Sequence, residues 1–362
     1  MKIGIIGNNN LNYLPYLKKY TDILEETNTD YEVVTWDRTL TEQEDNEKIL
    51  LFKYLAPLNN SKVKKIKDYL MYYRFVKQVL KNKKYNRLII LTPQTGIIFI
   101  RLLKNKYPQK YIFDIRDFTY DNFYLYRFLM NLLVENSIIT IVSSPAFNRW
   151  LPKSKKYILS HNIDNTYFDY FVNRNREIDL DQVRRIRICF IGMIRPIFYR
   201  DNKKLITALA NHKNFELHYL GEELVKGYLK KFCVENQINN VYFRGKYQPK
   251  EKIEFYGDTD LLNGIFGSRN LEVCTLIPNR LYESCILRKP ILVSANTYLA
   301  KIVMENGLGL ALDFDNDNLA DKILNYYKNL EYEEYDTNCK KYLEQVRIDE
   351  EIFKRTIKKI IS

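Results

Sequence analysis

The stretch Pro278 to Ser294, PNRLYESCILRKPILVS, predicts a short helix that runs directly into a buried strand. Pro278 suits the first position of that helix, where the missing N–H costs nothing, so the helix should begin near Asn279. Its free N–H groups and its positive dipole end would then point back toward the preceding loop. A helix joined to a buried strand in this way is typical of a parallel α/β sheet.

Strand and helix patterns alternate on both sides of this stretch. Apolar runs that predict strands lie at 3–7, 31–35, 87–91, 111–115, 138–142 and 156–159, and again at 187–192, 215–220, 241–245, 261–266, 291–293 and 309–312. Helical patterns separate most of them. The alternation predicts an α/β fold of two tandem Rossmann-like domains with helices on both faces of each sheet.

The domain boundaries follow from a lapse in that alternation. Between Asp164 and Arg185 the chain turns to polar, charged and aromatic residues. We therefore expect a first domain over 1–165, a linker over 166–185, a second domain over 186–334, and a C-terminal helical segment over 335–362 that packs back on the first domain. A chain of 362 residues is long enough for two sizeable cores.

Composition excludes several classes of protein. The five cysteines are scattered without metal-ligand spacing, which favours a reduced cytoplasm and no structural metal. The N-terminal apolar run is too short for a secretory signal. The best apolar run, Leu88 to Leu103, is interrupted by Pro93 and carries Arg101, so we expect no membrane span.

The net charge of +13 indicates polyanionic partners, and most of it lies in one segment. Nine Lys or Arg residues lie between Lys62 and Lys84 against the single acid Asp68. Apolar residues at helical spacing (Val63, Ile66, Leu70, Tyr73, Val76 and Leu80) predict an amphipathic helix with the basic residues on its other face. Lys62, Lys64, Lys65, Lys67 and Arg74 are the residues that we expect to face an anionic membrane. A solvated charged face is the alternative. Nucleic acid is disfavoured because no recognition motif accompanies the charge.

The loop after the strand at 187–192 predicts a seat for a diphosphate. Gly192 ends the strand, and Arg195 and Arg200 follow before a helix. Guanidinium groups and free backbone N–H groups both favour phosphate oxygens. Ordinary solvated surface arginines are the alternative interpretation.

The helix that starts near Asn279 supplies the second part of this site. Glu283 lies about one turn inside the helix, where its carboxylate can accept hydrogen bonds from two vicinal ribose hydroxyls. The alternative is a helical glutamate that is solvated or paired with Arg280 three residues earlier.

The order of these motifs, over about Ile188 to Leu330, resembles the nucleotide-sugar domain of GT-B glycosyltransferases that make bacterial surface and capsular polysaccharides. The resemblance implies a cleft between the two domains. It places Arg200 where the family has a phosphate-binding lysine, Arg195 near the family's arginine, and Glu283 at its ribose-binding glutamate. Donor-binding roles are thereby expected for Gly192, Arg195, Arg200, Thr275, Pro278, Asn279, Arg280 and Glu283. One departure is that Thr275 stands where many members have a second glutamate, with Glu272 a loose substitute; this leaves a retaining mechanism in doubt.

The N-terminal half resembles the family's acceptor domain. Gly7, Asn8, Asn9 and Asn10 form the loop after the first strand, and asparagine tolerates left-handed backbone well, so a tight functional loop is expected. A plain strand-to-helix turn explains it equally, and no dinucleotide fingerprint is present.

Two catalytic candidates follow later strands of this half. Asp114 and Asp117 lie at the carboxyl end of a strand, where open α/β sheets bind ligands. Asp117 is favoured as general base because it lies beyond the strand; a loop ion pair with Arg116 is the alternative. His161, in an HN pair that similar enzymes often share, would contact donor or acceptor, or else hydrogen-bond only to the linker.

The sequence therefore predicts a hexosyltransferase-type GT-B enzyme that moves a sugar from a nucleoside diphosphate donor, UDP favoured over GDP, to a hydroxyl of a glycan or lipid-linked oligosaccharide. Arginines and a helix N-terminus would stabilise the departing diphosphate, so neither a metal nor a cofactor is expected. We expect a cytoplasmic location, peripheral at the inner face of the plasma membrane. The alternatives are a nucleotide-sugar epimerase of the same fold and a non-catalytic membrane-associated binding protein. Donor sugar, acceptor, linkage, stereochemistry and oligomeric state stay open.

Overall fold

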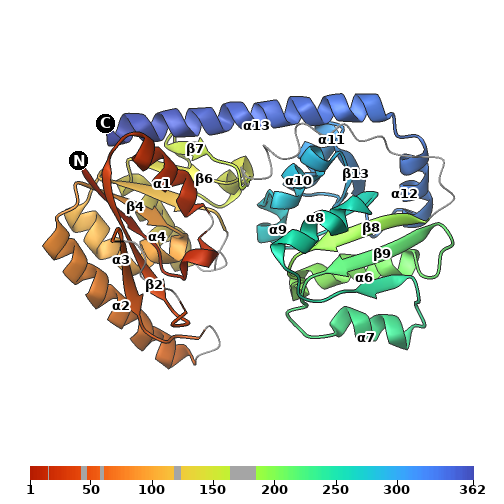
Figure 1. Ribbon diagram of the computed structural model, residues 1–362, viewed down its shortest axis with the longest axis horizontal. Coiled ribbons are helices and arrows are strands. Elements are labelled where there is room, and N and C mark those ends of the chain that lie inside the picture. The colour runs from red at the N-terminus through yellow and green to blue at the C-terminus, as the bar shows by residue number, and fades with distance from the viewer. Residues whose placement is uncertain (15, 42–46, 58–60, 118–123, 164–184) are drawn as a thin grey trace. The chain divides into compact units, whose positions relative to one another are not determined.

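The computed structural model describes all residues except 15, 42–46, 58–60, 118–123 and 164–184 (Figure 1). It divides into two compact units: Met1–Asn162 together with Ile348–Ser362, and Ile163–Arg347. We call these the first and the second unit. The predicted linker, except Arg185, lies outside the described residues.

The first unit is built on a seven-stranded parallel sheet in the order β3-β2-β1-β4-β5-β6-β7. Its strands are β1 (Lys2–Ile6), β2 (Asp30–Asp37), β3 (Ile49–Lys53), β4 (Arg87–Leu91), β5 (Tyr111–Ile115), β6 (Ile139–Val142) and β7 (Tyr157–Leu159). Its helices are η1 (Leu11–Tyr13), α1 (Leu17–Glu26), α2 (Lys62–Lys83), α3 (Pro93–Lys106), α4 (Tyr124–Asn136) and η2 (Pro145–Arg149). The chain order reverses between β1 and β4, the switch point where such sheets bind ligands.

The second unit is built on a six-stranded parallel sheet in the order β10-β9-β8-β11-β12-β13. Its strands are β8 (Ile186–Ile191), β9 (Phe215–Leu220), β10 (Val241–Phe243), β11 (Leu261–Gly264), β12 (Ile291–Ser294) and β13 (Gly309–Leu312). Its helices are η3 (Pro196–Phe198), α6 (Tyr199–Ala208), α7 (Tyr228–Glu235), α8 (Pro249–Gly257), α9 (Leu271–Thr275), α10 (Asn279–Leu287), α11 (Tyr298–Glu305) and α12 (Leu319–Lys328). The switch point lies between β8 and β11. The predicted pair of Rossmann-like domains is confirmed.

The last helix, α13 (Tyr332–Ile361), contributes to both units. In the second unit, Tyr335, Cys339 and Leu343 join the main core. In the first unit, Phe353 and Ile357 are buried with the residues of α1 and β1, and Phe353 meets the ring of Tyr20 edge-on at 5.6 Å between centroids. Figure 1 shows this blue end of α13 lying along α1. The prediction that the C-terminal helix packs back on the first domain is confirmed.

Two local expectations are wrong. Pro278 precedes α10 instead of opening it, because its ψ of 156° is extended; its carbonyl accepts the Leu281 N–H at 3.1 Å. In α2, the N-terminal apolar residues do not face the core. Val63, Ile66 and Leu70 are 79%, 62% and 54% exposed. The later members of the predicted stripe do pack: Val76 and Leu80 are buried, together with Tyr72, which the stripe did not include.

The described part of the chain contains neither a helix that could span a membrane nor a cluster of metal-binding side chains. Every helix there is too short or too polar to cross a bilayer. No group of three or more His, Cys, Asp or Glu side chains in it is arranged to hold a metal ion.

Candidate functional site

Three glycines line the carboxyl ends of neighbouring strands in the second unit. Gly192, Gly221 and Gly245 follow β8, β9 and β10, with φ values of +122°, +135° and +70°. The backbone of these loops is packed closely, since a Cβ on Gly221 would lie 2.0 Å from the Gly192 carbonyl oxygen. Such close approach admits no side chain at Gly221, so backbone groups alone form this part of the sheet edge.

Arg280 joins the two strands at the switch point. Its guanidinium donates to the carbonyl oxygens of Ile191 at the end of β8 and of Asn263 in β11. The same group stacks on the Phe190 ring at 3.9 Å and lies 4.8 Å from the Phe266 ring. Arg280 is 7% exposed, and burial lowers the pKa of its guanidinium. The Arg280 side chain, which was predicted to bind the donor, thus hydrogen-bonds to the protein's own backbone. These bonds hold the N-terminus of α10 beside Gly192.

The loop that carries the two predicted phosphate-binding arginines is anchored by a buried asparagine. Asn202, in the first turn of α6, donates to the carbonyls of Phe198 and Ile265 at 3.0 and 2.9 Å. Its side-chain oxygen accepts from Tyr219 and Asn263, each at 3.0 Å. Because α6 begins at Tyr199 and not after Arg200 as predicted, Arg200 lies in the first helical turn.

Both arginines are already paired with carboxylates. Arg195 donates from both terminal nitrogens to Glu272, at 2.6 and 3.2 Å. Arg200 donates to Asp201 at 2.9 Å and to Asp315, which also pairs with Lys204. The hydrogen bonds from Lys204 and Arg200 hold the pKa of the Asp315 carboxyl well below its usual range. A diphosphate at this site would meet oriented guanidinium groups, and at Arg200 it would compete with Asp315.

Glu283 has partners that differ from the expected Arg280. Its two carboxylate oxygens accept from the Lys252 ammonium and the Tyr256 hydroxyl, both on α8. Burial raises the pKa of Tyr256, and the Glu283 charge raises it further. A carboxylate oxygen has room for more than one hydrogen bond, so Glu283 can still accept ribose hydroxyls. Thr275 is fully buried, and its hydroxyl donates to the Leu271 carbonyl at 2.8 Å.

The structure therefore brings part of the predicted donor set together. Gly192 and the first turn of α10 adjoin, since a Cβ on Gly192 would lie 3.5 Å from the Arg280 guanidinium. Asn279 is exposed at that first turn, where an α-helix leaves its N–H groups without intrahelical acceptors. Arg195 reaches α9 through Glu272.

In the first unit, the Gly7 to Asn10 loop lies at the switch point between β1 and β4. Asn10 donates to Asp37 at 2.9 Å and accepts from the Arg38 N–H at 3.2 Å, while Asn8 accepts from the Thr92 hydroxyl at 3.3 Å. None of the three asparagines has left-handed backbone, so that expectation is wrong. The unusual residue is instead Thr92, with φ of +75°, a strained value for a β-branched residue.

The acids after β5 differ in environment. Asp114 is fully buried and accepts from Arg116 at 2.6 and 2.9 Å and from the Tyr20 hydroxyl. The ion pair of Arg116 is thus with Asp114. Asp117 is exposed in the following turn. Burial, together with the charges of Asp114 and Asp117, raises the pKa of the Tyr16 hydroxyl.

His161 is buried against α13 rather than hydrogen-bonded only to the linker. Its Nε2 lies 3.0 Å from Asp349, and its backbone N–H donates to Glu350 at 2.5 Å. Lys19 donates to the His161 carbonyl at 2.5 Å and to Glu350 at 2.8 Å. These contacts fix the C-terminal helix to the carboxyl end of the first sheet.

Sequence reasoning missed several of these partners. Lys252, Tyr256 and Asp315 meet the site from elements far along the chain, and Asn202, although close to Arg200, bonds to remote residues; no local spacing indicates these contacts. Thr92 was missed because backbone strain leaves no mark in the sequence.

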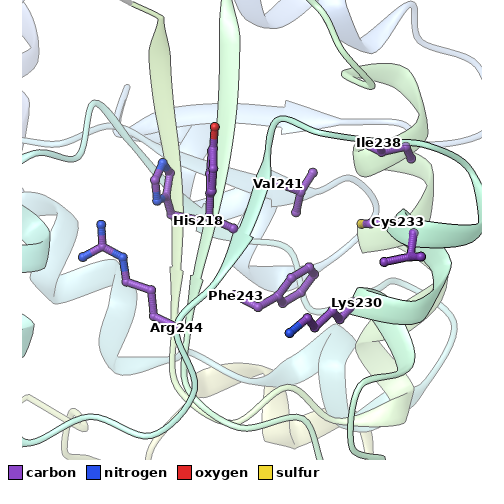
Figure 2. Close-up of a pocket in the computed structure, with 9 residues that line it drawn as sticks. His218, Lys230, Cys233, Ile238, Val241, Phe243 and Arg244 are labelled. Atoms are coloured by element: carbon purple, nitrogen blue, oxygen red, sulfur yellow. The ribbon is translucent and has the colours of Figure 1, made fainter.

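A hollow of about 510 Å³ lies elsewhere in the second unit, at the free edge of its sheet. Figure 2 shows Cys233 and Ile238 on the α7 side, facing Val241 and Phe243 of β10, with Arg244 and His218 on the other side of the strand. Its nine lining residues include none of the predicted donor-binding residues.

Comparisons with known proteins place the fold. No protein-family model and no curated protein matches the sequence. Among solved structures, Anabaena Alr3699/HepE in complex with UDP is similar over 99% of this chain and 99% of its own, with a TM-score of 0.71 and 15% identity. A glycosyltransferase from Rickettsia africae is similar over 100% and 98%, with a TM-score of 0.67 and 13% identity. UDP-GlcNAc 2-epimerase from Methanocaldococcus jannaschii is similar over 96% and 100%, with a TM-score of 0.56 and 11% identity. The chain therefore has the GT-B fold.

Proposed function

We propose that this protein is a metal-independent glycosyltransferase of hexosyltransferase type. It moves a sugar from a nucleoside diphosphate donor, UDP in preference to GDP, to a hydroxyl of a glycan or lipid-linked oligosaccharide in bacterial surface polysaccharide synthesis. The observation that carries the proposal is the switch point of the second sheet, where the Gly192 loop, the α10 N-terminus and Glu283 lie on adjoining elements.

Each part of this switch point has a role toward the donor. The first turn of α10 offers N–H groups and a positive dipole end to the diphosphate. Arg195 and Arg200 supply the positive charge that the leaving nucleotide needs as its negative charge grows. Glu283 accepts the ribose hydroxyls. Structural neighbours that hold UDP and UDP-glucose support this donor class.

A binding experiment tests the donor site. Two ribose hydrogen bonds to a carboxylate predict that the wild type binds UDP on the order of 10- to 100-fold more tightly than 2′,3′-dideoxy-UDP. The Glu283→Ala variant should lose that preference, whereas Glu305→Ala, at a side chain 61% exposed on α11, should keep it. Titration calorimetry measures both affinities. A wild type that binds neither nucleotide would contradict the proposal.

For the acceptor, we assign the proton-accepting role to Asp117 in an inverting reaction. Asp117 is exposed in the turn after β5, whereas Asp114 is buried and accepts hydrogen bonds from Arg116 and Tyr20. Asp117→Asn should lower kcat for transfer with little change in UDP affinity, because the residue lies in the other unit. Unchanged kcat would remove Asp117 from the mechanism. Activity that persists in EDTA is expected, because arginines and a helix dipole carry the charge.

The fold also occurs in an epimerase, and this is the second candidate function. The two are separated by the products of UDP-sugar turnover. A transferase releases UDP and forms a glycosidic bond or free sugar, whereas an epimerase changes the stereochemistry of the sugar. Conversion of UDP-GlcNAc into its 2-epimer would support the second candidate.

We further propose that α2 binds an anionic membrane surface at the inner face of the plasma membrane. Its outward face carries Val63, Ile66 and Leu70, with the exposed Lys67 and Arg74 between them at helical spacing. Apolar side chains can enter the headgroup region while the basic ones meet lipid phosphates.

Liposome sedimentation tests the α2 surface. Vesicles with anionic lipid should bind the wild type, neutral vesicles should bind it weakly, and Ile66→Asp should reduce binding. The control is Leu224→Asp in the second unit, where the wild-type side chain is 62% exposed. Equal loss of binding in both variants, or none in either, would count against α2.

A further inference from the structure

The ion pair of Arg195 with Glu272 is built into the backbone that carries it. Arg195 precedes η3, and its guanidinium lies 5.6 Å from the Phe198 ring. Glu272 stands in the first turn of α9, where the Asn270 side chain caps the helix by accepting the Glu272 N–H at 2.7 Å. Both ends of the pair are thus fixed by local structure before any ligand arrives.

The contact uses both atoms at each end. Nη1 and Nη2 of Arg195 donate to the two carboxylate oxygens at 2.6 and 3.2 Å, and the side chains are 42% and 22% exposed. Bidentate pairing restricts the guanidinium to one plane. A guanidinium has five N–H donors, and two are used here, so three N–H groups stay available to a second acceptor.

The other polar residue of α9 does not share this role. The Thr275 hydroxyl is buried and bonded to the helix backbone, so Glu272 is the carboxylate that α9 presents to the arginine loop. Glu272 therefore lies beside Arg195, the arginine predicted to contact the donor phosphates. Its negative charge would act on those phosphates through Arg195.

We propose that Glu272 is a positioning residue that holds Arg195 in the orientation needed as the diphosphate leaves. This deepens the proposed function and rests on it. Without the carboxylate, the long arginine side chain samples many rotamers and must be ordered during the reaction. With it, the donors are oriented in advance, which is how fixed dipoles stabilise a developing charge.

The charge of Glu272 leads to opposite effects on binding and turnover. The carboxylate reduces the positive potential that attracts a bound diphosphate. Glu272→Gln should therefore leave UDP affinity unchanged or tighter while kcat falls about 10- to 100-fold, as misplacement of a positioning group does. Loss of a merely structural contact would weaken UDP binding as well.

The experiment measures UDP release from UDP-glucose and UDP affinity in parallel. Glu272→Asp, which keeps the charge, should recover part of kcat. Glu272→Gln combined with Arg195→Ala should be no slower than Arg195→Ala alone, because the glutamate acts through the arginine. The matched control is Glu216→Gln, which breaks the Arg187 pair of 2.6 Å at similar exposure in the same unit, and should leave kcat unchanged.

Two failures are distinguishable. A wild type that neither binds UDP nor releases it from UDP-glucose overturns the proposed function and the positioning role with it. If the wild type releases UDP from UDP-glucose, two results overturn the positioning role alone. One is a kcat for Glu272→Gln equal to or above the wild-type value. The other is a double variant in which the effects of Glu272→Gln and Arg195→Ala on kcat are additive.

Discussion

Replacing Arg280 with methionine separates a structural role from a donor-binding role. Methionine keeps an unbranched apolar side chain between the Phe190 and Phe266 rings but donates no hydrogen bond. The carbonyls of Ile191 and Asn263 would lose their charged donor at the switch point. The perturbation thus removes the tie between β8 and β11 with little change in packing.

The size of the effect follows from these contacts. Each buried carbonyl left without a donor costs about 1–3 kcal/mol, so two cost roughly 2–6 kcal/mol. Removing the buried guanidinium offsets part of this loss of stability, because burial disfavours the charged form of Arg280 and lowers its pKa. We expect a net loss of about 2–4 kcal/mol in the stability of the second unit, which corresponds to roughly 30- to 700-fold faster amide exchange.

Hydrogen exchange read by mass spectrometry localises this loss. Peptides over β8 and β11 should lose protection, while peptides over the first unit should not. Arg269→Met is the control, because the Arg269 side chain is 69% exposed and pairs with Asp315 only at 3.6 Å. Wild-type protection in Arg280→Met together with a large loss of UDP affinity would refute this reasoning and make Arg280 a donor ligand.

Two further perturbations test the units separately. Phe353→Ala should destabilise the first unit by about 3–5 kcal/mol, because the Phe353 ring is 2% exposed and packs against Tyr20. Unfolding of this unit can be followed by the fluorescence of Trp36 and Trp150, which both lie in it. The control is Ile352→Ala, which should cost under about 0.5 kcal/mol because Ile352 is 40% exposed. Burial lowers the pKa of His218 despite the opposing charge of Glu216, with Arg187 and Arg244 adding to the lowering. The unfolded chain then binds the extra proton first, so stability should fall as pH drops below about 6.5, the ordinary histidine value. His218→Gln should flatten this dependence between pH 7.5 and 5.5, and an unchanged slope would contradict the assignment.

The sheets were predictable because parallel strands buried on both faces appear in the sequence as continuous apolar runs. The predicted bounds of β4, β5, β9 and β13 match those of the structure. The edge strand β3 was missed although Ile49 to Phe52 form an apolar run; apart from Leu51, its residues are only partly buried or exposed.

The face that α2 turns to the core could not be predicted. The predicted apolar stripe runs from Val63 to Leu80, but its first three members, Val63, Ile66 and Leu70, are exposed, whereas Val76 and Leu80 are buried beside Tyr72. The C-terminal part of α2 meets neighbouring elements, where Tyr72 contacts the Trp36 and Phe99 rings and Tyr73 stacks on Phe99. A periodic pattern specifies a helix, whereas the packed face depends on partners distant in sequence.

The loops and the helix that form the candidate site could be predicted from the sequence, but the partners of its side chains could not. Glycines after strands and a helix after Pro278 are local signals, and the structure contains both in the second unit. The partners of Glu283, Arg195 and Arg200 come from α8, α9 and the loop after β13. Contacts between such remote elements depend on tertiary structure, which local propensity does not describe.

The division of α13 between the units has a consequence for folding during synthesis. The second unit is continuous in sequence, so its core needs no residue that is synthesised after Arg347. The first unit emerges earlier, yet Phe353 and Ile357 of its core follow the whole second unit. The first unit can therefore complete its core only after the whole of the second unit has been synthesised.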